Sequence, residues 1–222
     1  MKKIFNLIVL ITLSAILASA CACAKKPDYS AYISDLRKDI FVGENDDFGV
    51  TVWSGARETP YASDGVKNET LLNLTVKVVA KQEKGDKIAA TVCYDENEYA
   101  VDLKFHPVKS AMSASVNVNV LPEKQVIIKL SYGSEECTIT LNSALNSNTV
   151  SYFDAVNKAV DYCADYIKNH TENGKFNAEI SVRLLAENGN NYYYVGFFAT
   201  DGEKKAVLVD GETCTILAEK NG

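Results

Sequence analysis

Two cysteines one residue apart, Cys21 and Cys23, stand where an apolar N-terminal segment gives way to the charged residues 25–28. A Cys-x-Cys pair can bind a soft metal, act as a redox pair, form a disulfide or accept a lipid. A metal site would need more thiolates or imidazoles nearby, and the next cysteine is Cys93, 70 residues further on. The position of the pair in the chain therefore decides its chemistry more than its spacing does.

The first 20 residues have the layout of a secretory signal peptide. Lys2 and Lys3 precede a 14-residue apolar segment, residues 4–17, and the small residues 18–20 follow it. A membrane-spanning helix needs about 20 predominantly apolar residues. We therefore expect residues 1–20 to be removed after export.

The tripeptide 18–20 directly followed by Cys21 resembles the lipobox of bacterial lipoproteins, in which the cysteine thiol receives diacylglycerol before cleavage. The resemblance implies lipid attachment at Cys21, with Cys23 as the second candidate, on the extracytoplasmic face of the cell membrane. Lipoboxes usually carry Leu three residues before the cysteine, where this chain has Ala18. Ordinary cleavage after an A-x-A motif, followed by secretion, stays open.

The charge of the exported chain limits its partners. Removal of residues 1–20 takes away two lysines and leaves 21 basic and 29 acidic residues, a net charge of −8. Such a chain is not expected to bind nucleic acid, and anionic lipid head groups would not attract it. The expected partners are the membrane, through the lipid anchor, and another envelope or secreted protein.

The segment after the signal peptide predicts first a tether and then a β-sandwich. In residues 21–43, apolar side chains at helical spacing indicate a possible short helix within residues 28–42. Over residues 44–142, strict apolar–polar alternation predicts a seven-stranded antiparallel β-sandwich. The expected strands cover roughly residues 48–53, 72–80, 88–94, 99–105, 112–120, 126–132 and 137–141.

The cysteines of this domain are expected to be free thiols. Alternation places Cys137 on the apolar face of its strand and Cys93 on the opposite face of another, so a disulfide between them is disfavoured. Trp53 precedes both cysteines, whereas antibody-type domains have the order Cys, Trp, Cys.

Residues 151–222 predict an α+β domain. Ser151 and Asp154 form a capping pair, and an apolar stripe that includes Cys163 continues to about residue 170. Four strand-like segments follow, separated by Asn-Gly and Asp-Gly turns. We expect a four-stranded meander with the helix covering one of its faces.

The end of the chain, residues 192–219, resembles PepSY-type domains, whose last strand reads roughly VDxxTGEVL. The matching residues are Asp210, Thr213, Ile216 and Leu217, whereas Cys214 and Thr215 stand where the family prefers Gly and Glu. The resemblance implies a PepSY- or cystatin-like extracytoplasmic accessory or inhibitory module. It carries over no catalytic residue.

No motif in the chain predicts catalysis, a metal or a cofactor. The G-x-S-x-G, P-loop and dinucleotide-binding patterns are absent. The two histidines, His106 and His170, lack the partners of a zinc site, and both are expected to be structural. The acidic residues 44–47 lack the spacing of a calcium loop. A hydrolase with dispersed carboxylates stays open as the least favoured alternative.

Two surface regions are candidate ligand-binding sites. The polar loop over residues 57–69 contains Arg57, Tyr61 and Asp64 together. A later strand presents Tyr192, Tyr194 and Phe198 on one face, which either contacts a ligand or packs against the β-sandwich. We therefore expect a lipid-anchored binding or accessory protein, with envelope protein–protein interaction or peptidase inhibition as alternatives.

Overall fold

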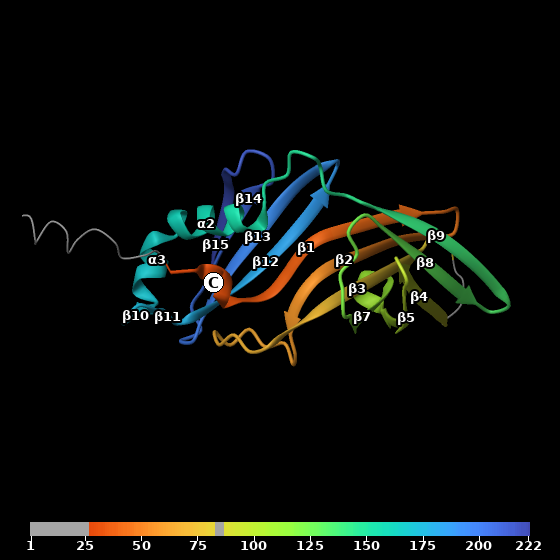
Figure 1. Cartoon of the computed structure of the whole chain (residues 1–222), viewed down its shortest axis with the longest axis horizontal. Helices are drawn as coiled ribbons and strands as arrows, with labels where there is room; N and C mark the ends of the chain where they lie inside the picture. Colours follow the sequence, from red (N-terminus) through yellow and green to blue (C-terminus); the bar gives the residue numbers. More distant parts are fainter. Residues whose placement is uncertain (1–26, 83–86) are drawn as a thin grey trace, which may run out of the picture.

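The computed structural model describes residues 27–82 and 87–222. The expected signal peptide, Cys21 and Cys23 lie outside the described residues. Thirteen strands form one sheet, and α2 (Tyr152–Tyr162) and α3 (Ala164–Asn169) cover part of it (Figure 1). The expected mainly β fold, with a sandwich followed by an α+β meander, is confirmed.

Strand β1 (Ile33–Glu44) connects the two halves of the molecule and runs between them in Figure 1. Its first part pairs in parallel with β12 (Ala178–Glu187), and its end pairs with β9 (Glu135–Ser143). Along most of its length it also pairs with β2 (Phe48–Glu58). One strand therefore belongs to the sandwich and to the meander.

The prediction of a short helix within residues 28–42 is wrong. Only η1 (Tyr29–Tyr32) is helical, a single 3₁₀ turn capped by Asp28, and β1 begins directly after it. The register of β1 against β2 shifts between Arg37 and Asp39, at a β-bulge. Because a bulge inserts one residue, it offsets the alternation of side chains, and the apolar positions come to imitate a helical period.

The sandwich contains all seven expected strands. One layer contains β2, β3 (Thr70–Ala80), β7 (Ala111–Asn117) and β6 (Lys104–His106), and a second contains β9, β8 (Gln125–Tyr132), β4 (Ile88–Tyr94) and β5 (Asn97–Asp102). The strand expected over residues 99–105 is divided into β5 and β6, before the 3₁₀ turn η2 (Pro107–Lys109). Buried side chains from both layers form the core, among them Val52, Leu74, Ile128 and Leu141. Cys93 and Cys137 are half-buried free thiols.

The second half contains the expected helical region and four-stranded meander. The meander runs through β12, β13 (Asn190–Ala199), β14 (Lys204–Asp210) and β15 (Ile216–Asn221), and a short hairpin, β10 (Thr171–Glu172) and β11 (Lys175–Phe176), precedes it. The predicted cap is confirmed, since Ser151 Oγ accepts a hydrogen bond from the Asp154 N–H at 3.2 Å. Cys163 is buried between α2 and α3, in the core formed by the helices and one face of the meander.

Candidate functional site

A row of cross-strand neighbours crosses the face of the sheet that lies opposite the helices, from β13 of the meander to β3 of the sandwich. Cross-strand partners in this row are Tyr194, Arg183, Arg37, Gly55 and Asn73. Val182 and Leu184 lie in the core beneath the helices. Because successive strand residues point to opposite faces, Arg183 between them points away from that core. Parallel pairing of β1 with β12 therefore brings two arginines together.

Two guanidinium groups, those of Arg57 and Arg183, form ion pairs with the carboxylate of Asp35, which is 2% exposed, and the charge of a third, on Arg37, interacts with it. Arg183 Nε donates to Asp35 Oδ2 at 2.8 Å, and Ser181 Oγ donates to the same oxygen at 3.2 Å. Arg57 Nε lies 3.7 Å from Asp35 Oδ1 and has no hydrogen-bond partner among the described residues. The cluster therefore has an excess of positive charge on a chain whose net charge is −6.

Arg37 is the third cation of the cluster. Burial lowers its pKa, the charges of Arg183 and Arg57 lower it further, and the charge of Asp35 acts in the opposite direction. The guanidinium nevertheless stays charged, because arginine is not deprotonated in proteins. Placing this third guanidinium beside the other two costs electrostatic energy, which a bound anion would recover.

Aromatic rings hold two of the three arginines in place. Arg37 Cζ lies 5.4 Å from the centre of the Trp53 ring, and Arg57 Cζ lies 4.0 Å from that of Tyr61. Cation–π contacts of this kind orient a guanidinium and leave its outward N–H groups able to donate. We call the three arginines, together with Asp35, Trp53, Tyr61 and Tyr194, the arginine face.

The arginine face contains a small depression. It is lined by residues that include Asp35, Arg37, Trp53 and Arg57, and its volume is about 10 Å³. That is about the space of one water molecule, whereas small-molecule pockets measure roughly 300–1,000 Å³. The arrangement suits contact with the surface of another macromolecule.

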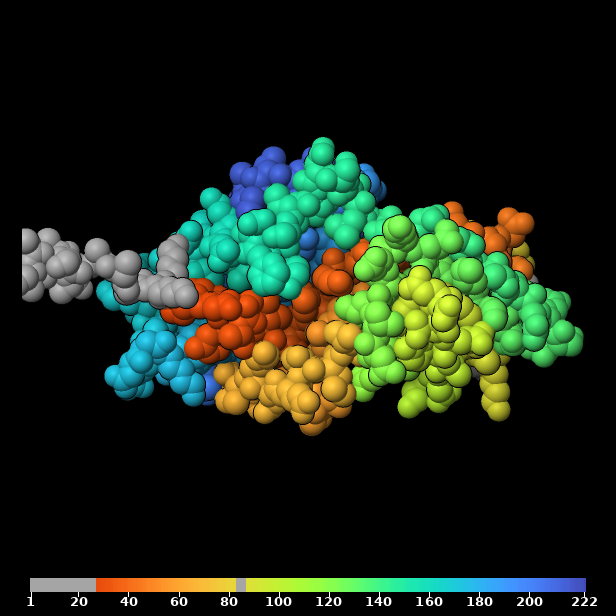
Figure 2. Space-filling model, viewed as in Figure 1, coloured from red at the N-terminus to blue at the C-terminus, as the bar shows by residue number. Residues whose placement is uncertain are grey.

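Two buried glutamates, one in each half of the molecule, accept hydrogen bonds from the backbone of the loop after β2. Glu58 accepts hydrogen bonds from Ala62 N at 3.1 Å and Asn68 N at 3.0 Å, and Glu179 on β12 accepts one from Gly65 N at 3.2 Å. Burial raises the pKa of Glu179, although its hydrogen bond from Gly65 acts in the opposite direction. In Figure 2 the loop, in light orange, forms the lower edge of the molecule beside the red N-terminal segment.

The structure brings together three of the six residues predicted as ligand-binding. Arg57 is part of β2 and not of the loop, and it contacts Tyr61 on the arginine face, where Tyr194 interacts with Tyr61 and Arg183. The other three, Asp64, Tyr192 and Phe198, lie outside it. Asp64 accepts a hydrogen bond from Val66 N within the loop, and the two aromatic residues occupy other positions on the same face of β13.

Four residues of the arginine face were not predicted: Asp35, Arg37, Trp53 and Arg183. The helix expected within residues 28–42 contains the first two and gives them no binding role, and the sequence pattern places Trp53 in a strand without indicating a ligand contact. Arg183 had one local signal, because it interrupts the apolar residues of β12. Nothing in the spacing of the sequence connects β12 with β1.

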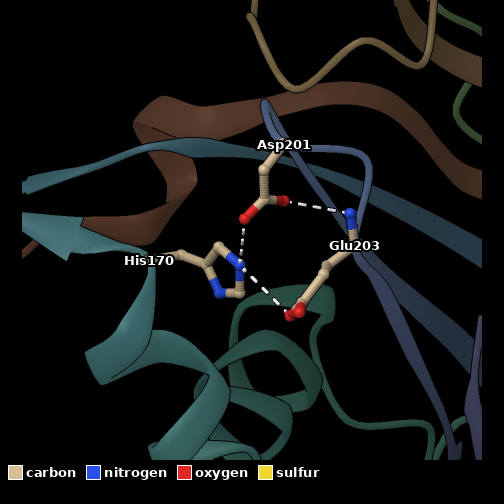
Figure 3. Close-up of side chains that lie close together, drawn as sticks. All are labelled: His170, Asp201 and Glu203. Carbon is tan, nitrogen blue, oxygen red and sulfur yellow. Dashed lines mark hydrogen bonds and ion pairs between the residues drawn. The ribbon is translucent and has the colours of Figure 1, made fainter.

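A second cluster of side chains could hold a metal ion. The ligand atoms of His170, Asp201 and Glu203 all lie within 4.8 Å of one another (Figure 3), and no other such group occurs in the described part of the chain. His170 is the C-cap residue of α3, and the two carboxylates come from the turn between β13 and β14.

Comparisons with known proteins identify no relative of this chain. No family model, no curated protein and no solved structure matches it. None of the helices in residues 27–82 and 87–222 has the length and hydrophobicity of a transmembrane segment. The structure defines a mainly β protein that presents a basic, aromatic face.

Proposed function

We propose that this chain is a lipid-anchored extracytoplasmic binding protein that uses the arginine face to bind an acidic segment of another protein. The observation that carries the proposal is the presence of three interacting guanidinium groups at one buried carboxylate, two of them in ion pairs with it. Guanidinium groups pair with carboxylates through two parallel hydrogen bonds. Arg, Tyr and Trp are also the residue types that dominate binding energy in protein interfaces.

The shape and charge of the molecule favour an acidic protein segment over other anions. The depression is too small to enclose a small molecule. A nucleic acid would be repelled by a chain with a net charge of −8 after loss of its two N-terminal lysines. A protein segment with a few Asp or Glu side chains matches the extent of the face and needs no wider basic surface.

Glu58 and Glu179 do not suggest a hydrolytic site. Both oxygens of Glu58 accept backbone hydrogen bonds from the loop, and Glu179 accepts the N–H of Gly65. These carboxylates are buried and serve to hold the loop. We therefore propose a binding role, and the PepSY-type resemblance, which implies an accessory or inhibitory module, agrees with it.

The proposed binding is tested with the fluorescence of Trp53, the single tryptophan of the chain, which contacts Arg37. A hexaglutamate peptide should change this fluorescence saturably, whereas a hexaglutamine peptide should not. Arg37→Gln should weaken binding by about tenfold or more, because a hydrogen bond to a charged group contributes about 1.5–3 kcal/mol. Lys104→Gln, which removes a positive charge on β6 in the sandwich, is the matched control.

Two results would contradict the binding proposal. One is the lack of a saturable response to hexaglutamate in the wild-type protein. The other is equal binding by Arg37→Gln and Lys104→Gln, which would show that the peptide does not bind at the arginine face. Circular dichroism of each variant confirms that the fold is intact.

The lipid anchor is tested by labelling cells with a fatty-acid analogue. We expect label on the wild type and on Cys23→Ala, and its loss from Cys21→Ala. Label that persists in the double variant would overturn the anchor and leave the binding proposal to be judged by the peptide titration.

A further inference from the structure

We propose that His170, Asp201 and Glu203 form a zinc-type divalent metal site that joins the end of α3 to the turn between β13 and β14. His170 Nε2 lies 3.3 Å from Asp201 Oδ2 and 3.5 Å from Glu203 Oε2. The His170 side chain is 8% exposed, whereas those of Asp201 and Glu203 are 59% and 69% exposed. A buried imidazole thus faces two carboxylates that are open to solvent (Figure 3).

The hydrogen bond at Nδ1 of His170 determines that Nε2 is the atom able to bind a metal. Nδ1 lies 2.8 Å from the backbone carbonyl oxygen of Tyr166, which can only accept, so Nδ1 carries a hydrogen and donates. In the neutral ring the lone pair is then on Nε2, directed at two negatively charged oxygens. That arrangement is unfavourable unless a cation lies between them.

The distances from Nε2 to the two carboxylates favour a metal ion between these groups over a proton on Nε2. A charge-assisted N–H···O bond to a carboxylate measures about 2.7–2.9 Å, and both distances from Nε2 are longer. Zinc lies roughly 2.0–2.2 Å from imidazole nitrogen and carboxylate oxygen, so neighbouring ligands of a tetrahedral ion are about 3.3–3.5 Å apart. The two separations from Nε2, 3.3 and 3.5 Å, agree with that geometry.

The surroundings orient all three ligands. Metal-binding histidines usually donate their second ring N–H to a carbonyl or carboxylate, as His170 does to Tyr166. The Tyr166 ring also lies against the His170 ring, with centroids 4.1 Å apart and the two planes tilted by 33°, and the Tyr166 hydroxyl donates to the Glu203 carbonyl at 3.0 Å. Asp201 Oδ1 accepts the Glu203 N–H at 3.0 Å and leaves Oδ2 directed at His170.

The fourth ligand of such a site would be water, because the two carboxylates leave one side open to solvent. Three protein ligands with one open position are a common arrangement for zinc. A hard cation such as Mg²⁺ or Ca²⁺ prefers oxygen ligands and more of them, so an imidazole with two carboxylates favours zinc. A metal ion bound there would also connect α3 to the turn between β13 and β14 and so hold the helices against the sheet.

Calorimetric titration of the purified, chelator-treated full chain with ZnCl₂ tests the proposal. A Cys21→Ala/Cys23→Ala background removes the competing N-terminal thiols. We expect one zinc ion per chain, no competition from millimolar Mg²⁺, and a rise in Tm of roughly 5–10 °C at a zinc concentration 100 times the Kd. Co²⁺ should give the visible absorption spectrum of a four-coordinate ion.

The exposed ligands supply the decisive variants, because a change at the buried His170 could disturb folding. Asp201→Asn and Glu203→Gln should each weaken zinc binding by at least about tenfold, and His106→Gln, at the other histidine, should not change it. A lack of saturable zinc binding would overturn the proposal. Equal affinity in the wild type and in both carboxylate variants would also overturn it.

Discussion

Arg37 on β1 and Arg183 on β12 lie opposite each other in the only parallel strand pair among the described residues. Like charges opposite each other destabilise a sheet. Here Asp35, on the same strand as Arg37, accepts the hydrogen bond of Arg183 and offsets part of the repulsion. The remaining positive charge is held in place by the fold and is therefore ready to meet an anion without rearrangement.

Replacement of Asp35 by Asn should destabilise the protein strongly. Three guanidinium groups would then lie together without a counter-charge. Removing one partner of a buried ion pair costs about 3–5 kcal/mol, and because Arg57 and Arg183 are 31% exposed we expect a loss of about 2–3 kcal/mol. Urea unfolding followed by circular dichroism measures the change.

Glu44→Gln is the control for that experiment. Glu44 forms an exposed ion pair with Lys81 at 2.7 Å, and exposed pairs contribute less than about 1 kcal/mol. If Asp35→Asn cost no more than Glu44→Gln, the electrostatic account of the arginine face would be wrong.

The local parts of the fold could be predicted from the sequence, because their signals lie within single segments. The alternation in β2, β3 and β8, and the cap at Ser151, are of this kind. The bulge in β1 breaks such a signal, and the stretch consequently resembled a helix. Pairing of β1 with β12 depends on tertiary packing across the whole chain, so the assembled arginine face could not be predicted. The same holds for His170 and its two carboxylates.

Glu179→Gln should change how stability depends on pH. Burial raises the pKa of Glu179 above its ordinary value of 4.5, so the folded protein binds this proton more tightly than the unfolded chain. Its contribution to stability is therefore full below the unfolded pKa and is lost as pH rises through the folded pKa. Glutamine does not titrate, so the Glu179→Gln variant lacks this pH-dependent contribution to stability.

The free energy of unfolding of the wild type minus that of Glu179→Gln should therefore fall as pH rises from about 4. Asp39, whose pKa burial also raises, is present in both proteins, and its effect cancels. Urea unfolding at a series of pH values provides the comparison. A difference that stays constant or increases with pH would contradict the expectation.

Gly65→Ala should release the loop after β2. Gly65 has φ +85°, and an added Cβ would clash with Thr200 N and with the Ala199 carbonyl carbon. Gly133 has φ +61° with nothing within 4 Å of such a Cβ, so Gly133→Ala carries only the cost of the left-handed conformation. We expect Gly65→Ala to lose about 1–3 kcal/mol more than this control.

Trypsin can report the released loop, because Lys67 lies within it. Cleavage after Lys67 should be faster in Gly65→Ala than in Gly133→Ala or the wild type. Equal cleavage rates in all three proteins would show that the loop does not depend on the close approach of Gly65 to Thr200.

Cys214 has φ +57°, at the position where the PepSY-type pattern has glycine. A side chain in the left-handed region costs roughly 1–2 kcal/mol, and glycine avoids most of that cost. Cys214→Gly and Cys214→Ala both remove the thiol, so their difference isolates the backbone effect. We expect the Gly variant to be more stable than the Ala variant by about 1 kcal/mol in urea unfolding.

Cys137, half-buried in the extended strand β9, is the matched control. There the order should reverse, with Ala more stable than Gly by about 0.5–1 kcal/mol. The same order at both positions would show that the backbone at Cys214 is unstrained.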